Sequence, residues 1–164
     1  MTYEIIISEL TEGEEEDMHL LVKKAFDEFI APDYSQEGID TFYGFIHPDL
    51  ISDRIKSGGS FVLSARNAGR IIGIIEISDS AMGDVFRIRL FDVAKDFHGI
   101  GVGRKLVNRG IEKCRMINPA MKTLTVNSSP FAVKIYQRLG FVETEGRQMK
   151  NGIIYYPMQK DINA

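Results

Sequence analysis

Hydrophobic and polar positions alternate along the 164 residues with two periods, one typical of short strands and one typical of amphipathic helices. Apolar side chains recur at helical spacing over residues 14–30, which predicts a long first helix. The rest of the first sixty residues predicts a strand at 3–8, an irregular or short helical stretch at 39–46, and a short helix opened by Pro48 and closed by Gly58-Gly59. This part of the chain is therefore expected to be mainly helical.

Strand patterns dominate the next part of the chain, and helices and strands alternate after residue 93. We predict strands at 61–66, 71–78 and 85–93 with turns at 67–69 and 79–84, then a helix at 101–116, a strand at 123–127, a helix at 130–139 and a hairpin at 141–161 around Asn151-Gly152. A helical crossover joins the strands at 85–93 and 123–127, so these two should run parallel. The predicted fold class is therefore mixed α/β, with a mostly antiparallel sheet of about six to seven strands flanked by helices.

The helix at 130–139 has a clear local pattern. Ser129 is a good N-cap, Pro130 suits the first helical position, and Gly140 suits the end. Phe131, Ile135 and Leu139 form a predicted apolar stripe, with Tyr136 beside it.

Composition is that of a globular chain, with 44% hydrophobic and 26% charged residues. No repeat, low-complexity segment or linker divides it, so residues 1–164 are expected to form a single domain. No apolar run approaches a membrane span and the first residues do not resemble a signal peptide, so we expect a cytoplasmic protein with no membrane partner. The single cysteine, Cys114, excludes an internal disulfide framework, and the histidines lack metal-ligand spacing, so no metal is expected.

The net charge of −3 hides an asymmetry. Residues 1–60 carry fourteen acidic and four basic side chains, whereas residues 61–164 carry nine and sixteen. Nucleic acid is not an expected partner, because a surface that tracks its backbone normally needs a basic domain with interleaved aromatic residues. The acidic run at 11–17 is most simply the first turn of the first helix, stabilised by the helix dipole.

The segment HGIGVGRKLV, residues 98–107, places Gly99, Gly101 and Gly103 before a basic amphipathic helix. The dinucleotide pattern GxGxxG fails at Arg104, and no GK[ST] of a P-loop follows. A strand end, a glycine loop and a helix start can still bind an anion, because free backbone N–H groups and the helix dipole point at it. Side chains at the three glycines would obstruct that approach. The alternative is a flexible structural turn with basic side chains, Arg109 among them, on its surface.

Two segments resemble the GNAT superfamily of N-acetyltransferases. VAKDFHGIGVGRKLV resembles its acetyl-CoA motif, with Gly101 and Gly103 matching and His98 in the place of glutamine or arginine. VNSSPFAVKIYQRLGF resembles its following strand and helix, with Tyr136 and Gly140-Phe141 in the expected places. The resemblance covers residues 61–161 well, as an acetyl-CoA-binding core with a C-terminal hairpin, and residues 1–60 only in outline, as variable acceptor-side elements.

The resemblance implies a GNAT-like sheet that splays between residues 91–93 and 124–127 to admit pantetheine. It implies backbone contacts from Phe91 and Val93 to the pantetheine amides, and a pyrophosphate on the N–H groups of residues 98–104. The implied binding set for acetyl-CoA, the co-substrate, is Phe91, Asp92, Val93, His98, Gly99, Ile100, Gly101, Val102, Gly103, Arg104, Lys105, Asn127 and Tyr136. His98 lacks arginine's permanent charge, so phosphate binding is expected to be weaker or to depend on pH.

The implied activity is direct transfer of acetyl from acetyl-CoA to a primary amine, on a small molecule or a peptide. The two implied catalytic residues are Tyr136, which would donate a proton or hydrogen bond to the departing thiolate, and Glu76, the candidate general base. Glu76 is the only carboxylate inside the apolar run at 71–77, although it equally suits a solvated sheet face. Glu28 and Asp92 are most simply solvated residues of a helix and a strand end. The backbone N–H near Phe91 suits an oxyanion.

The acidic N-terminal part suggests attraction of a cationic acceptor, with aromatic residues from 29 to 45 either shaping that pocket or packing the helices on the sheet. Two other functions stay open at this point. A non-catalytic acyl-CoA-binding sensor or interaction module would have the same fold, and a regulatory domain would bind ATP or NAD at the glycine loop. A homodimer through the C-terminal hairpin is possible but is not required by the sequence.

Overall fold

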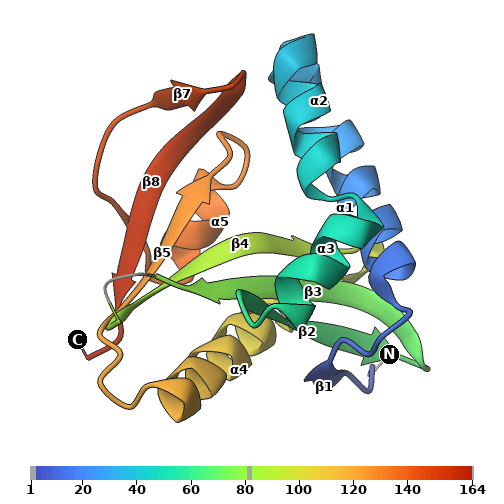
Figure 1. The fold of residues 1–164 in the computed structure, drawn as a ribbon, viewed down its shortest axis with the longest axis vertical. Helices are drawn as coiled ribbons and strands as arrows, with labels where there is room; N and C mark the ends of the chain where they lie inside the picture. The colour runs from blue at the N-terminus through green and yellow to red at the C-terminus, as the bar shows by residue number, and fades with distance from the viewer. Residues whose placement is uncertain (1–2, 81–82, 164) are drawn as a thin grey trace.

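The computed structural model describes residues 3–80 and 83–163, so part of the predicted turn at 79–84 lies outside the described residues. One sheet runs through this part of the molecule (Figure 1). The elements in chain order are β1 (Ile6–Glu9), α1 (Glu15–Phe29), the short 3-10 helix η1 (Ala31–Asp33), α2 (Gln36–Phe45), α3 (Pro48–Lys56), β2 (Ser60–Asn67), β3 (Arg70–Asp79), β4 (Val85–Val93), η2 (Lys95–Phe97), α4 (Val102–Ile117), β5 (Thr123–Ser128), α5 (Val133–Arg138), β6 (Val142–Glu143), β7 (Gln148–Lys150) and β8 (Ile153–Asp161).

The strand order is β1-β2-β3-β4-β5-β8-β6, with β7 also paired to β8. Every pair is antiparallel except β4 with β5, which is parallel as the crossover predicted. The described residues thus form a mixed, mostly antiparallel sheet of eight strands. The count exceeds the predicted six to seven because the arm between α5 and β8 folds as two short strands, β6 and β7, where the sequence suggests one.

Two irregularities of β4 shape the centre of the sheet. Pairing of β4 with β5 stops at Ile88 and Val126, although β4 continues to Val93, so the two strands separate toward their C-terminal ends. On the other edge of β4, Leu90 faces Glu76 while Ile88 faces Ile77, which leaves Arg89 as an extra residue in a β-bulge. The predicted splay is therefore present, and a bulge that the sequence did not indicate lies beside it.

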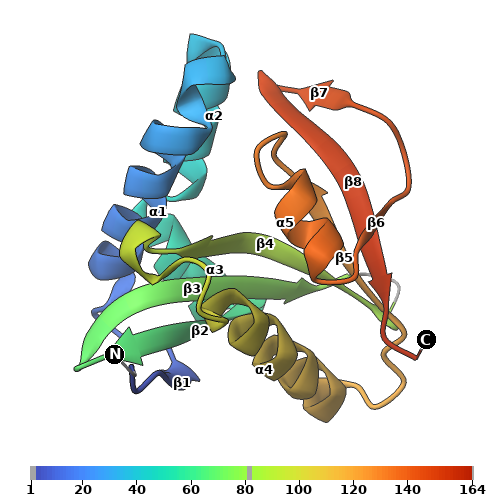
Figure 2. The same ribbon diagram turned by 180° about the vertical axis from the view of Figure 1, so that it is seen from behind.

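Helices cover both faces of this sheet (Figures 1 and 2). One buried cluster lies between the sheet and α4 with α5, and the other lies between the sheet and α1 with α3. Gly110 of α4 sits directly on β3, since a Cβ there would lie 2.7 Å from Ile77 Cδ1. Helix α4 is thus packed closely on the centre of the sheet.

The tip of the C-terminal hairpin contacts α2, at the end of the molecule away from α4 (Figure 1). Asn151 and Gly152 have φ of 51° and 77°, which confirms the predicted tight turn. A Cβ on Gly38 would lie 2.2 Å from the carbonyl oxygen of Gly152, so the two backbones touch. The Tyr34 hydroxyl adds a hydrogen bond of 2.7 Å to the carbonyl of Ile154. The hairpin and α2 therefore join above the splayed strands.

The predicted start of α5 is wrong. Residues 130–132 form a turn, in which Ser129 Oγ accepts a hydrogen bond from the N–H of Ala132, and the helix begins only at Val133. The buried face also differs from the predicted stripe, since Tyr136 and Leu139 are buried whereas Phe131 and Ile135 are 46% and 36% exposed. Gly140, at φ 94°, ends the helix as predicted.

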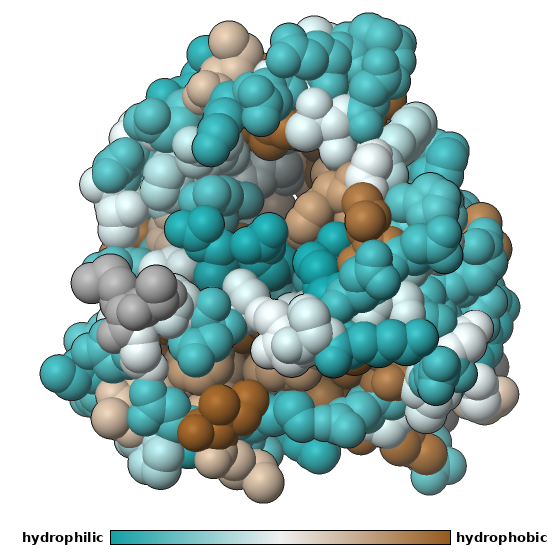
Figure 3. All heavy atoms as spheres, in the orientation of Figure 1, coloured by the Kyte–Doolittle hydropathy of each residue, from teal (hydrophilic) through white to brown (hydrophobic). Residues whose placement is uncertain are grey.

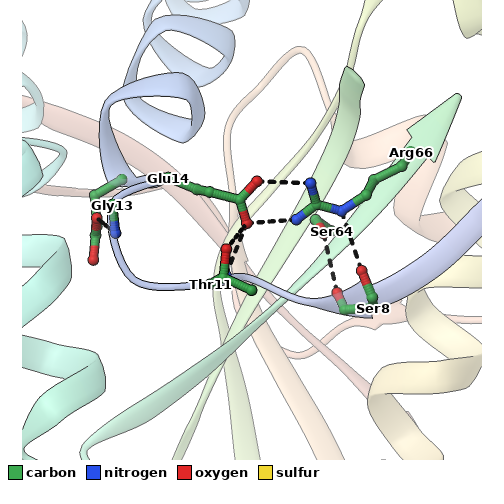
Figure 4. Close-up of polar contacts among 7 residues, drawn as sticks. Ser8, Thr11, Gly13, Glu14, Ser64 and Arg66 are labelled. Carbon is green, nitrogen blue, oxygen red and sulfur yellow. Dashed lines mark hydrogen bonds and ion pairs between the residues drawn. The ribbon is translucent and has the colours of Figure 1, made fainter. Parts of the chain in front are cut away.

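The acidic run before α1 does more than face the helix dipole (Figure 4). Glu14 binds the guanidinium of Arg66 on β2 through two hydrogen bonds of 2.6 Å, and it also accepts a hydrogen bond from the N–H of Thr11 at 2.8 Å. Arg66 Nε donates to Ser8 Oγ on β1. These contacts, with the hydrogen bond to Arg66 as the largest cause, lower the pKa of Glu14 to about 2. One carboxylate thus ties the start of α1 to the sheet.

Candidate active site

A cavity of about 1050 Å³ lies where β4 and β5 separate. Its walls come from β4, β5, the glycine loop, the start of α5, the C-terminal hairpin and the aromatic side chains of α1 and α2. Figure 3 shows the molecule hollowed between β8 and α2, with strongly hydrophilic side chains over β4 at the rim of the hollow. The cavity is large enough to hold both a flexible thiol arm and a small second ligand.

The glycine loop forms one end of this cavity. Gly99 and Gly101 have φ of 76° and 89°, in the left-handed region, and a Cβ on either would meet no atom within 4 Å. Gly103 differs, because its Cβ would lie 3.0 Å from the ring of Phe91, so its role is to let α4 pack on β4. The prediction that all three glycines clear space for an anion therefore needs correction at Gly103.

Backbone N–H groups at this end point toward open space. The first helical hydrogen bond of α4 runs from the N–H of Lys105 to the carbonyl of Gly101, so the N–H groups of residues 102–104 have no acceptor inside the helix. The guanidinium of Arg104 is held by the carbonyl of Arg138 at 3.0 Å and lies in the same wall. The loop therefore offers both dipole and charge to an anion.

The end of β4 exposes backbone groups to the open seam. The N–H of Ala94 donates to Ile72 across the β3–β4 pair, and in an antiparallel ladder alternate residues bond to the same neighbour. Phe91 and Val93 therefore direct their N–H and carbonyl groups away from β3, toward the space that β5 leaves. His98 Nε2 donates to the carbonyl of Val93 at 2.7 Å, which folds its ring back onto the strand end.

The side chain of Tyr136 reaches the cavity from α5. It is 5% exposed, and its ring lies 5.7 Å from that of Phe91 and 5.4 Å from that of Phe141. Burial, followed by the nearby charge of Asp92, raises the pKa of its hydroxyl. The hydroxyl therefore stays protonated near neutral pH and is able to donate a hydrogen bond.

Asp92 lines the cavity at the end of β4, near Tyr136. Burial raises the pKa of its carboxyl to about 8. This position corrects the expectation of a solvated strand end. A carboxyl with such a pKa is suited to accept a proton near neutral pH. In the sequence, the only signal for this role of Asp92 is a polar residue near the end of a largely apolar strand.

Glu76 occupies a different place from the one that the general-base hypothesis requires. It is fully buried and does not belong to the cavity wall. Arg54 donates to its two oxygens at 2.8 and 3.1 Å, and the Ser60 hydroxyl donates at 3.1 Å. Arg54 also donates to the carbonyl of Phe45 and stacks over the Phe45 ring at 4.0 Å. This geometry corrects the hypothesis, because Glu76 holds an arginine that positions an aromatic wall residue.

The other residues of the predicted binding set divide between the wall and its surroundings. Asn127 lines the cavity, whereas Ile100 and Lys105 are outside its wall. Phe29 of α1 stacks on Phe131 at 4.7 Å, so an aromatic pair joins the two sides of the cavity near His98. From the sequence, Arg87 and Arg89 share one strand face that is expected to be solvated rather than to contact the acceptor, but both line the cavity.

These features define the class of protein: an α/β domain with a splayed parallel strand pair, a left-handed glycine loop at a helix start, and a tyrosine in the resulting cavity. A sequence profile described as "Acetyltransferase (GNAT) domain" matches residues 30–162. The chain belongs to the GNAT acetyltransferase family. No curated protein matches it.

Solved structures agree on the fold. The PaiA N-acetyltransferase from Thermoplasma acidophilum, in complex with coenzyme A, superposes with a TM-score of 0.80 at 15% identity, over 96% of this chain and 99% of that one. A spermidine N-acetyltransferase SpeG chimera from Vibrio cholerae and human SSAT gives 0.66 at 20% identity, over 96% and 95%. N-acetylglutamate synthase from Neisseria gonorrhoeae, with coenzyme A and N-acetyl-glutamate, gives 0.73 at 15% identity, over 99% of this chain and 36% of that one.

Two kinds of feature are absent from the part of the chain that the structure describes. Residues 3–80 and 83–163 contain no helix long and apolar enough to cross a membrane. The same residues include no group of three His, Cys, Asp or Glu side chains suited to a metal ion.

Proposed function

We propose that the protein transfers the acetyl group of acetyl-CoA directly to a primary amine. The observation that carries the proposal is that the open seam of β4 and β5, the N–H groups after Gly101 and the Tyr136 hydroxyl all face one cavity. The glycine loop suits a pyrophosphate, and the carbonyl of Phe91 and the N–H of Val93 suit the amides of an extended thiol arm. A thioester held there supplies an activated acetyl group.

The amine must lose a proton as it attacks. In the proposed reaction the amine nitrogen bonds to the thioester carbonyl carbon, the carbon–sulfur bond breaks, and the sulfur leaves as a thiolate. Asp92 accepts one proton of the ammonium, so that the amine attacks in its neutral form. The Tyr136 hydroxyl donates a proton to the departing thiolate, and the second amine proton, lost as the amide forms, restores the Tyr136 hydroxyl through solvent. The backbone N–H of Phe91 is the donor placed to stabilise the oxygen of the tetrahedral intermediate.

A direct test combines a binding measurement with turnover. Acetyl-CoA and CoA should raise the unfolding temperature of the protein more than ATP or NADH do, and thiol release should require an added amine. A saturable CoA shift with no thiol release on any amine would favour the non-catalytic acyl-CoA-binding function. A shift with ATP or NADH alone would contradict the cofactor assignment.

A further inference from the structure

The charge of the cavity is opposite to what the N-terminal composition suggests. Seven residues from 1–60 line the cavity, and all are apolar or aromatic, among them Phe26, Tyr34, Phe42 and Phe45. The acidic side chains of that half lie elsewhere, for example in ion pairs of Glu28 with Lys95 at 2.7 Å and of Glu12 with Lys56 at 3.3 Å. Within the described part of the chain, the acidic half therefore supplies no carboxylate to the cavity.

Arginines of β4 supply charge there instead. Arg87 and Arg89 both line the cavity, on either side of Ile88, the last residue of β4 that pairs with β5. The bulge makes Arg89 the extra residue of its strand, and its guanidinium lies 5.2 Å from the centre of the Phe45 ring. Within the described residues, the side chain of neither arginine has a hydrogen bond or an ion pair.

Arg54 and Arg89 differ in their carboxylate partners. The two guanidinium groups lie near the same Phe45 ring, but only Arg54 forms an ion pair with Glu76, through both carboxylate oxygens. Arg89 has the same aromatic neighbour and no carboxylate of its own. Partial burial, the largest cause, lowers the pKa of Arg89, yet a guanidinium stays charged at any physiological pH. A guanidinium with no carboxylate partner in a cavity wall favours an anionic ligand.

We propose that the acceptor amine carries an oxyanion, a carboxylate or a phosphate, on the same small molecule, and that Arg89 together with Arg87 binds it. The proposal rests on the proposed acetyl transfer and names its substrate class. Asp92, at the far end of β4 from Arg87, faces the amine, and the two arginines hold the other end of the acceptor. A polyamine would place a second ammonium beside two unpaired guanidinium groups, so the site disfavours it.

Matched acceptors test this proposal by thiol release from acetyl-CoA. γ-Aminobutyrate, butylamine and putrescine share a carbon chain, phosphoethanolamine and ethanolamine differ by the phosphate, and phenylalanine and its amide differ by the carboxylate. We expect kcat/KM to be at least about tenfold higher for the anionic member of a set. Preference for the phosphate over the carboxylate, or the reverse, identifies which oxyanion the site takes.

The matching protein variants are Arg89→Gln and Arg89→Lys, with Arg70→Gln at the exposed turn between β2 and β3 as the control. Arg89→Gln should raise KM for the anionic acceptor about 10- to 100-fold, Arg89→Lys should restore part of it, and Arg70→Gln should change nothing. The acetyl-CoA shift of the unfolding temperature should persist in all three.

Two outcomes count against the proposal, and they are distinguishable. Equal or faster turnover of butylamine or putrescine, unaffected by Arg89→Gln, would overturn the anionic acceptor while acetyl transfer stands. Absence of thiol release with every amine, despite an acetyl-CoA shift, would overturn the transfer reaction and this inference with it.

Discussion

Replacing Asp92 with asparagine should reduce activity and increase stability at the same time. The amide keeps the shape of the side chain but neither ionises nor accepts the ammonium proton. Removal of a general base typically costs 10²- to 10⁴-fold, so we expect kcat/KM to fall at least about 100-fold near pH 8. A residue that only filled the cavity wall would not produce that loss.

The pH dependence of this loss in kcat/KM can be worked out from the pKa of Asp92. With a pKa of about 8, the carboxyl of Asp92 is about 1% ionised at pH 6 and about half ionised at pH 8. The ratio of wild-type to Asp92→Asn kcat/KM should therefore rise about 50-fold between those pH values. Using the ratio removes the titration of the acceptor amine, because the amine contributes equally to both proteins.

Stability should change in the opposite direction. A carboxyl whose pKa rises from 3.8 to about 8 on folding contributes stability below pH 4, and that stability is lost as the pH rises through 8. The unscreened difference is about 6 kcal/mol, and we take about 2 kcal/mol because part of the carboxyl faces the open cavity. Asp92→Asn should therefore melt about 4–8 °C higher than wild type at pH 9 and about equally at pH 4.

Glu145→Gln is the matched control, since Glu145 is an exposed carboxylate in the same cavity wall. Thiol release and thermal unfolding on the three proteins, from pH 4 to 9, complete the experiment. A pH-independent ratio of the kcat/KM values, or an Asp92→Asn variant with full activity, would refute Asp92 as the proton acceptor. Equal melting at pH 9 would refute its raised pKa.

Three further predictions concern the glycine loop, the tyrosine and the ion pair at the start of α1. Gly101→Glu should abolish the acetyl-CoA shift of the unfolding temperature, whereas Gly58→Glu, at another open glycine of positive φ, should carry the same backbone strain and keep the shift; loss in both variants would point to unfolding. Tyr136→Phe should retain the acetyl-CoA shift and lower kcat about tenfold or more, because the ring packing stays and the donor goes; unchanged kcat would remove the hydroxyl from the reaction. Glu14→Gln should lower the free energy of unfolding at pH 7 by about 2 kcal/mol, and in urea titrations the deficit should shrink as the pH falls from 4.5 toward 2, since the lowered pKa of Glu14 stabilises the fold only while the carboxylate is ionised; a deficit independent of pH would contradict the ion pair.

Local sequence signals predicted most of the fold. Hydrophobic periodicity located α1, α4 and the strands from β2 to β5, Pro48 and Gly58-Gly59 located α3, and Asn151-Gly152 located the hairpin turn. The errors occurred where a contact with a distant segment overrides the local pattern. Ser129 and Pro130 favour a helix start, yet the chain makes a turn before Val133 that buries Tyr136 against Phe91 and Phe141. The hydrophobic pattern of ten residues does not reveal which side of this helix is buried against the sheet.

The site was predictable to the extent that it consists of backbone. Gly99 and Gly101 require left-handed conformations at a strand-to-helix connection, and this requirement is visible in the sequence as glycine. The roles of carboxylates were not predictable, because burial and pairing decide them. Glu76 and Asp92 are both acidic residues among apolar neighbours, but Arg54 and Ser60 bind the first, while the second faces the cavity with its pKa raised.

The charged residues that line the cavity show why a charge count along the chain is a weak guide to a ligand. The acidic residues of α1 and the segment before it lie on outward positions, where lysines and Arg66 neutralise several of them. A strand, by contrast, sends alternate side chains to opposite faces, so Arg87 and Arg89 share one face of β4 whatever the charge of the helices above it. The bulge then keeps Leu90 in the core while Arg89 stays in the cavity. The cavity wall therefore contains two arginines of a central strand and none of the fourteen carboxylates of residues 1–60.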